Sequence, residues 1–391
     1  MKKLLAILLA CVMLISLTAC SGSNDASAQT QTPKTDAPAS DSEAAPSNTP
    51  EVKPFKYGFI CWGTADEHGR TLNAAVQWAV EAAGGEFIMD GSAISAESTV
   101  AAAENLISAG CDMISFCTYA GESTVATISD LCQANQVYWT MWDTTISDAE
   151  IQAYIDNDPY YVGCTSEDNV TAGYNTMKSL GEAGATNVII IRYGSNIPTC
   201  DDRCTGALNY IQEAGGITVV EDMIIQSGDD YKNAISNVLL AHPEVDSVLL
   251  AGSGTYSSSV AEAFKEKGKD TFYIGAFDYF DSMGDMLKSG ELTVINGGHM
   301  VTGTFSALLA INSYFGSPLS AQKAHITIPY LVLDSYEDYE AYIQYASQGA
   351  AYTSEELQQF LVAYNPDLTL DSFQEGVSKW SVDDIMSRKN G

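Results

Sequence analysis

The sequence predicts an α/β protein with two doubly wound parallel-sheet lobes and a mostly helical C-terminal extension. Apolar runs of strand length alternate with amphipathic runs of helix length from residue 57 to residue 333, and several helical runs end in glycine. This alternation is typical of parallel strands covered by helices on both faces. The pattern starts again near residue 161, which indicates two such sheets in series.

In the first half, a strand is followed three times by a helix and a further strand. The strands are the apolar runs at 57–62, 86–89, 113–117 and 137–141. The amphipathic helices between them are predicted at 71–83, 98–109 and 123–134. Gly84, Gly85 and Gly110 stand where the first two helices end, as is common at helix C-termini.

The second half continues the same order with more elements. Its predicted strands lie at 161–164, 188–191, 218–220, 248–250, 272–274, 292–295 and 326–333. Its predicted helices lie at 169–183, 201–214, 231–241, 257–267, 282–289 and 302–315. This part is therefore expected to form the second sheet with its own covering helices.

The chain begins with the pattern of an export signal. Lys2 and Lys3 precede an apolar run at 4–17 that is too short to span a bilayer, and small residues lead to Cys20. This layout resembles the bacterial lipobox, so we expect residues 1–19 to be removed and Cys20 to receive a diacylglycerol. The alternative is an ordinary secretory signal in which Cys20 is incidental.

Residues 20–52 are rich in Ser, Ala, Thr and Pro and have no apolar periodicity, so a flexible tether is expected. The prediction is an extracytoplasmic protein, lipid-anchored to the bacterial cell membrane.

Composition excludes one class of partner. Lys and Arg number 18 against 50 Asp and Glu, a formal net charge of −32. Such a surface repels nucleic acid, because nucleic-acid binding depends on basic residues that neutralise phosphate.

The cysteines and the motif search bear on chemistry. Of nine cysteines, Cys11 leaves with the signal and Cys20 takes the lipid, so seven remain, several of them in apolar strand-like runs. Cys200 and Cys204 have helical spacing but no second Cys or His pair nearby, which favours a structural role over a metal site.

The sequence also lacks a nucleophile elbow and a phosphate loop. We therefore predict no metal, no cofactor and no enzymatic activity.

Five short motifs occur in a specific order along the chain. They are Trp142-Asp143, Glu167-Asp168-Asn169, the run at 241–248, the run at 274–278 and the run at 287–292. Together they resemble type I periplasmic binding proteins, especially the ribose and galactose binders of sugar ABC transporters, over residues 53–333. The resemblance implies two lobes joined by a three-segment hinge, with a ligand trapped between the lobes.

The resemblance also implies where the chain passes between lobes. The crossings are expected near 156–159, near 275–278 or slightly beyond, and near 326–330. The N-lobe would contain 53–157 plus 298–328, and the C-lobe 158–297 plus 329–335. Residues 336–391 form the extension, which we expect to pack as a strap over one lobe or across the hinge, with a docking surface for a permease as the alternative.

Ligands of open α/β sheets bind at the carboxyl ends of the strands, so the site is expected in the loops that follow them. The resemblance places Asp143, Asp168, Asn169 and Asp278 at the family's binding positions. Trp62 and Trp142 would be stacking platforms for a sugar ring. The remaining candidates are Asp201, Arg203, Ser253 and His299.

Each candidate has a structural alternative. In these alternatives, Asp168 and Asn169 would cap the following helix and Asp278 would be a turn residue. The two tryptophans would belong to the core, and His299 would only lie in a glycine-rich turn. Asp201 stands where sugar binders usually present an Arg, Arg203 falls on a position the family uses structurally, and Ser253 replaces an Asn or Asp. These departures leave the identity of the sugar open.

The predicted function is an extracytoplasmic solute-binding lipoprotein. It would act as a monomer that captures a small neutral polyhydroxylated ligand, a sugar, and delivers it to the permease of an ABC importer. The alternative is a ligand-sensing lipoprotein that presents a sugar, nucleoside or other small solute to a membrane receptor.

Overall fold

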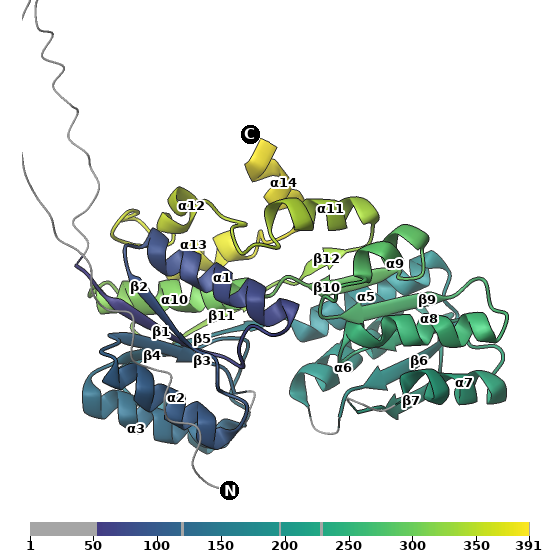
Figure 1. Cartoon of the computed structure of the whole chain (residues 1–391), viewed down its shortest axis with the longest axis horizontal. Coiled ribbons are helices and arrows are strands. Elements are labelled where there is room, and N and C mark those ends of the chain that lie inside the picture. The colour runs from purple at the N-terminus through teal and green to yellow at the C-terminus, as the bar shows by residue number, and fades with distance from the viewer. Residues whose placement is uncertain (1–52, 119–120, 195–196, 227–229, 391) are drawn as a thin grey trace, which may run out of the picture. The chain divides into compact units, whose positions relative to one another are not determined.

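The computed structural model describes residues 53–118, 121–194, 197–226 and 230–390, which belong to one compact unit. The predicted signal, Cys20 and the predicted tether lie outside the described residues. Two six-stranded sheets form the framework (Figure 1). Within the described part of the chain, no helix has the length and apolar character needed to cross a bilayer.

The first sheet is parallel throughout and has the strand order β11-β5-β4-β3-β1-β2. Helices α1 and α10 pack against one face and α2 and α3 against the other, as Figure 1 shows. Phe59 and Ile60 are adjacent in β1 and point into these two different cores, as the alternation of a strand requires. The elements of this lobe are β1 (Lys56–Ile60), α1 (Glu67–Ala82), β2 (Glu86–Asp90), α2 (Ala96–Ser108), β3 (Met113–Phe116), η1 (Glu122–Thr124), α3 (Val125–Asn135), β4 (Tyr138–Met141), α4 (Ala149–Asp156), β5 (Tyr161–Glu167), α10 (Val301–Tyr314) and β11 (Ala324–Ile328).

The second sheet has the order β12-β10-β9-β8-β6-β7, and β12 runs antiparallel to β10 at its edge. Helices α5 and α6 pack together on one face of this sheet, and α7 and α8 on the other. The elements are α5 (Asn169–Ala183), β6 (Asn187–Arg192), α6 (Pro198–Ala214), β7 (Thr218–Ile224), α7 (Tyr231–Ala241), β8 (Ser247–Leu250), η2 (Gly254–Tyr256), α8 (Ser257–Glu266), β9 (Tyr273–Phe277), α9 (Met283–Ser289), β10 (Val294–Gly297) and β12 (Leu331–Leu333).

The chain passes between the sheets three times, and the first of these crossings differs from the prediction. The first crossing follows β5 rather than preceding it, because β5 pairs with β4 and β11 of the first sheet. The expected start of the second lobe at residue 158 is therefore wrong, since a short apolar run does not reveal which sheet it joins. The second crossing lies at 298–300, between β10 and α10, which agrees with the predicted lobe boundary between 297 and 298, whereas the hinge range 275–278 lies within the second lobe.

The third crossing interrupts what the sequence predicted as one strand over 326–333. The structure divides it into β11 of the first sheet and β12 of the second. Pro329 stands between them and has no backbone N–H to donate, so it cannot continue a ladder of hydrogen bonds. The break therefore moves the chain from one sheet to the other at the predicted position.

The C-terminal extension contacts both lobes and the hinge, as Figure 1 illustrates for α11. The hydroxyl of Tyr342 donates to Glu67 of α1 at 2.9 Å, and the indole N–H of Trp380 donates to the carbonyl of Gly298 in the second crossing at 3.2 Å. Tyr339 packs against Gly284 of α9 in the second lobe. The extension consists of α11 (Tyr336–Tyr345), α12 (Ser354–Gln358), α13 (Leu370–Val377) and α14 (Val382–Asn390).

None of the seven cysteines within the described residues forms a disulfide, and all except Cys117 are buried. Burial raises the pKa of Cys111 to about 11 and that of Cys204 to about 12. These thiols therefore stay protonated at neutral pH and behave as small apolar side chains. The structural role predicted for Cys200 and Cys204 agrees with their burial on α6.

Helices α5 and α6 approach so closely that side chains are excluded at their contact. A Cβ atom on Gly173 would lie 1.9 Å from the carbonyl oxygen of Arg203, and one on Gly206 would lie 1.8 Å from that of Val170. Backbone atoms cannot move aside as a side chain can. This contact places Arg203 beside the start of α5.

We predict that Gly173→Ala lowers the free energy of unfolding by about 3 kcal/mol, because the added methyl group forces the two helices apart. Gly181→Ala in the same helix is the matched control, since its Cβ would meet only side-chain atoms, at 3.1 Å or more. That variant is expected to stay within about 1 kcal/mol of the original protein. Urea unfolding measures both values, and equal losses would contradict the backbone contact.

Candidate functional site

Polar and aromatic side chains from both lobes and from the hinge meet at the carboxyl ends of the strands. We call His68, Asp143, Asn169, Arg203, Asp278, His299 and Tyr330 the interlobe cluster. His68 and Asp143 belong to the first lobe, and Asn169, Arg203 and Asp278 to the second. His299 and Tyr330 lie in the second and third crossings.

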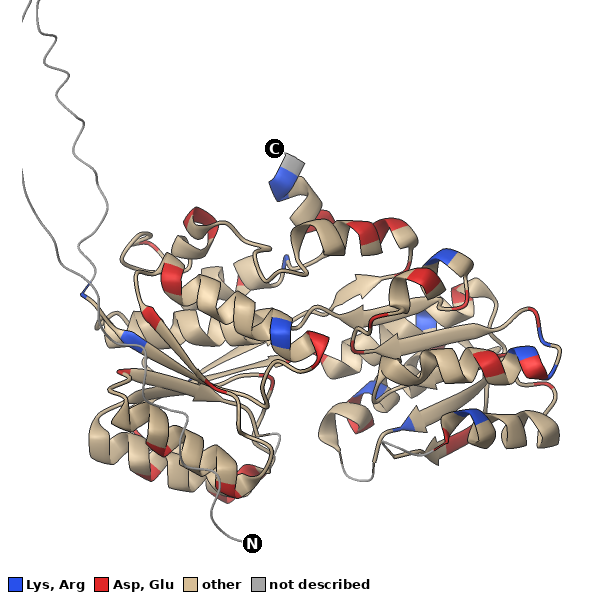
Figure 2. Cartoon of the chain, in the orientation of Figure 1, with Lys and Arg blue, Asp and Glu red and all other residues tan. Residues whose placement is uncertain are grey.

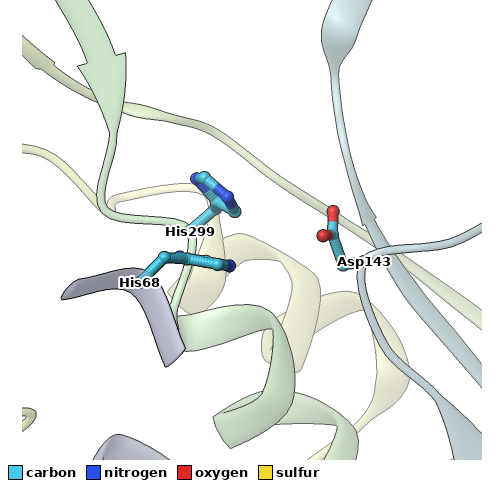
Figure 3. A group of neighbouring side chains, drawn as sticks. All are labelled: His68, Asp143 and His299. Carbon is cyan, nitrogen blue, oxygen red and sulfur yellow. The ribbon is translucent and has the colours of Figure 1, made fainter. Parts of the chain in front are cut away.

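Figure 3 shows three members of the cluster that point toward one another, His68, Asp143 and His299. One nitrogen or oxygen atom of each lies within 4.8 Å of the others. The two imidazole rings are 4.2 Å apart between centroids. His68 and His299 are thus neighbours in space although they are 231 positions apart in the sequence.

The start of α1 is shaped by Asp66, the N-cap residue. Its carboxylate accepts the backbone N–H of Gly69 at 2.7 Å and the indole N–H of Trp62 at 3.0 Å. The indole ring of Trp62 stacks on His68 with centroids 5.4 Å apart and an interplanar angle of 24°. Asp66 therefore holds Trp62 and His68 in one arrangement at the end of β1.

Asp143 and Asp278 have the same unusual backbone geometry. Asp143 follows Trp142 at the end of β4 with φ 51°, and Asp278 follows β9 with φ 66°. Left-handed φ values are uncommon outside glycine, although Asp tolerates them better than most residues. The two loops thus present carboxylates from opposite lobes in defined directions.

Arg203 connects the second lobe to the hinge through a buried network. Its guanidinium donates to the side-chain oxygen of Asn169 at 3.0 Å, to the carbonyl of Ala251 at 2.9 Å and to the hydroxyl of Tyr330 at 2.6 Å. Tyr330 in turn donates to Asn169 at 3.0 Å. Asp278 lies 3.9 Å from the guanidinium. Arg203 therefore positions its neighbours and has few donors left for a ligand.

Electrostatics differ among the titratable groups of the cluster. Burial, followed by the electrostatic influence of the neighbouring His68 and Arg203, lowers the pKa of His299 well below its ordinary value, so this imidazole is neutral at pH 7. Burial raises the pKa of Asp278, although Arg203 and His68 oppose the shift. Asp278 and the Nε2 atom of His299 are 4.0 Å apart.

Glu167 at the end of β5 lies next to the cluster and is buried. Burial, and then the neighbouring carboxyl group of Asp143, raise the pKa of Glu167 well above its ordinary value. Like charges this close cannot both ionise in a dry environment. The protonated form of Glu167 is therefore favoured.

The structure divides the predicted site residues into three sets. Trp62, Asp143, Asn169, Arg203, Asp278 and His299 lie in the interlobe cluster or directly against it. Trp142 is fully buried against Phe59, at 5.2 Å between centroids, which supports its interpretation as a core residue. The remaining predictions are tied to local structure.

Those remaining residues are Asp168, Asp201 and Ser253. Asp168 caps α5 by accepting the N–H of Thr171 at 2.9 Å. Asp201 pairs with Arg192 at 2.6 Å. Ser253 accepts the N–H of Thr255 at 3.4 Å. Sequence reasoning missed His68, Glu167 and Tyr330 as single site residues. Glu167 belongs to one of the five motifs and Tyr330 to a predicted crossing, whereas His68 lies in α1.

A family model described as a periplasmic binding protein domain matches residues 57–310. The chain belongs to this family. The resemblance inferred from the motifs is thus confirmed, and a periplasmic binding protein is a binding protein rather than an enzyme. A comparison with curated protein sequences gives no match.

Solved structures share the fold of this periplasmic binding protein at low sequence identity. A periplasmic sugar-binding protein from Pseudomonas fluorescens has a TM-score of 0.67 and 13% identity, covering 85% of this chain and 99% of its own. An ABC transporter solute-binding protein from Actinobacillus succinogenes, solved with D-allose, has a TM-score of 0.63 and 18% identity, covering 74% and 100%. A Mycobacterium smegmatis protein solved with β-D-fucofuranose has a TM-score of 0.59 and 18% identity, covering 76% and 97%.

We predict that Tyr330→Phe lowers the free energy of unfolding by about 2 kcal/mol, because the buried guanidinium of Arg203 loses an acceptor and Asn169 a donor. Tyr174→Phe is the matched control, since its hydroxyl makes an exposed hydrogen bond to Glu213 at 2.9 Å. That variant is expected to change stability by less than about 0.5 kcal/mol. Denaturant unfolding compares them, and a smaller loss for Tyr330→Phe would show that the network is not stabilising.

Proposed function

We propose that the protein captures a small neutral polyhydroxylated ligand, a sugar, between its two lobes and delivers it to an ABC importer. The observation that carries this proposal is the interlobe cluster, whose side chains come from both lobes and from two of the three crossings. A ligand bound there contacts both lobes at once. Sites at the carboxyl ends of parallel strands are where α/β folds usually bind small molecules.

The chemistry of the cluster suits hydroxyl groups. The carboxylates of Asp143 and Asp278 accept hydrogen bonds from hydroxyls, and bonds to ionised acceptors are the stronger kind. Trp62 offers a half-buried indole face for the apolar side of a sugar ring. Since the guanidinium of Arg203 is already committed to protein partners, it has few donors left to offset the charge of an anionic ligand.

The charge pattern favours a neutral ligand as well. Figure 2 shows Asp and Glu distributed over both lobes and the extension, with fewer Lys and Arg. A strongly acidic surface repels anionic solutes. Proteins of the same fold were solved with D-allose, β-D-fucofuranose and myo-inositol, all neutral and rich in hydroxyls.

Binding by two lobes gives a mechanism without covalent chemistry. A ligand held first by one lobe favours the closed arrangement, because closure adds contacts from the other lobe. The extension contacts both lobes and so takes part in the equilibrium between open and closed arrangements. The alternative to an importer is a membrane receptor that recognises the closed form. The presence of a permease gene beside the gene for this protein would distinguish the two.

We also propose that the protein is a monomer held at the outer face of the bacterial cell membrane through a lipid on Cys20. The support is the run of charged, apolar and small residues that precedes Cys20. A tether of about thirty residues lets a folded domain stay near a membrane partner without entering the bilayer.

A thermal-shift screen of residues 21–391 against monosaccharides, polyols, nucleosides and amino acids tests the ligand class. A sugar or polyol is expected to raise the melting temperature by several degrees, because binding to the native state stabilises it by mass action. A rise with amino acids alone would overturn the sugar proposal while keeping the binding fold.

With the sugar identified, Asp143→Ala and Asp278→Ala are each expected to weaken binding by roughly 10- to 100-fold, the loss of about one charged hydrogen bond. Isothermal titration measures the dissociation constants. Asp371→Ala is the control, because this exposed carboxylate lies on the extension at the start of α13. Unchanged affinity in both site variants would remove this assignment.

The lipid anchor has its own test. Cys20→Ser is expected to abolish incorporation of an alkyne-tagged fatty acid in bacteria and to move the protein from the detergent phase to the aqueous phase. Cys11→Ser is the matched control and is expected to keep both properties, since Cys11 lies within the predicted signal. Labelling that persists in Cys20→Ser would show that the anchor is elsewhere.

A further inference from the structure

Two of the four histidines of the chain meet in the interlobe cluster with a carboxylate between the lobes. His68, Asp143 and His299 come from α1, the β4 loop and the second crossing, and no other described group of three His, Cys, Asp or Glu residues is as close. Two imidazoles and one carboxylate are a ligand set that zinc and neighbouring transition metals favour. Calcium and magnesium prefer oxygen ligands alone.

The histidines carry nitrogen atoms that need a partner. Among the described residues, Nε2 of His68 and Nδ1 of His299 are buried from solvent without a hydrogen-bond partner. The side chain of His299 is only 7% exposed. A buried polar atom left unpaired costs about 1–3 kcal/mol, so two such atoms in one cluster indicate an absent binding partner.

The surroundings resemble the outer shell of a metal site. A metal-bound histidine usually directs its second ring nitrogen to a carboxylate, and Asp278 lies 4.0 Å from Nε2 of His299. Glu167, which is buried at the end of β5, lies next to Asp143. Within the interlobe cluster the carboxyl groups of Asp143 and Asp278 stand against one guanidinium, that of Arg203, which favours a bound cation.

The site also has adaptable geometry. Ligand atoms around a tetrahedral zinc ion are about 3.4 Å apart when the bonds are about 2.1 Å long. The three atoms lie within 4.8 Å, so side-chain movements of roughly 1 Å bring them into range. Beside the imidazoles lies a cavity of about 10 Å³, lined by Glu67, Tyr279 and Tyr342 as well, with room for one water.

We propose that His68, Asp143 and His299 bind a divalent transition metal, of which zinc is the reference, and that a fourth coordination position accepts hydroxyl oxygens of the captured solute. The second clause rests on the proposed function. The metal joins a residue of α1 and a residue of the β4 loop to the second crossing, so it ties the first lobe to the hinge. It thereby gives affinity for adjacent hydroxyl groups without a free arginine.

The first experiment measures the metal alone. Residues 21–391 are stripped with a chelator and titrated calorimetrically with Zn²⁺, and cobalt binding is followed by visible absorption. One equivalent is expected to bind, with cobalt bands typical of tetrahedral nitrogen and oxygen ligands. No binding of either ion would overturn the inference.

Variants then locate the site. His68→Ala and His299→Ala are each expected to weaken zinc binding by roughly 100-fold or more, beyond the 10- to 100-fold loss typical of an outer-shell change. His242→Ala is the matched control, since this half-exposed histidine lies beside Glu244 at 3.2 Å, away from the cluster. Metal-free melting temperatures show whether each variant folds. Equal zinc affinity in all three variants would overturn the assignment.

The last experiment separates this inference from the proposed function. The sugar from the thermal screen is titrated into the metal-free and the zinc-loaded protein. Tighter binding to the zinc-loaded form supports coordination of the ligand. Equal affinity in both forms overturns that clause while the sugar function stands. Zinc binding without sugar binding would leave the metal site intact and remove the proposed function instead.

Discussion

The buried guanidinium of Arg203 organises this molecule, because a charge withdrawn from water is tolerated only where its donors find acceptors. Its partners are Asn169 at the start of α5, the carbonyl of Ala251 after β8 and Tyr330 in the third crossing. These three groups meet at Arg203 only if α5 and α6 pack with their backbones in contact and the third crossing passes beside them. One side chain thus couples the packing of the second lobe to the path of the hinge.

The same network explains how the site is divided between fixed and adaptable groups. On the second lobe, Asn169 and Arg203 hold each other and Asp278 lies beside the guanidinium. On the first lobe, Trp62 and His68 stand at the start of α1, which Tyr342 of the extension contacts through Glu67. The extension therefore contacts α1 at the end where His68 lies.

Much of the fold followed from sequence. The strand and helix order, the two sheets and the third crossing were predicted from apolar runs and glycine positions. The first crossing was misplaced, because β5 has the same apolar character as the strands of the second sheet and only its pairing with β4 and β11 assigns it. Helix α4 was not predicted, since it is short and has a single buried residue, Ile155.

The site was less predictable than the fold. Asp143, Asp278 and His299 stood out because they follow strands, and a strand end is visible in sequence. His68 was not selected, since its contact with His299 depends on where α1 begins, which Asp66 sets by capping. Trp142 was expected at the ligand surface, but its ring faces Phe59 in the core, and alternation along one strand end does not decide that direction.

The central claim is that one solute is held by both lobes at the interlobe cluster. A crystal structure of residues 21–391 with the sugar identified by screening tests it most directly. The account predicts ligand hydroxyls within hydrogen-bond distance of Asp143 from the first lobe and of Asp278 from the second. A ligand that contacts one lobe alone, or that lies away from these two carboxylates, would contradict it.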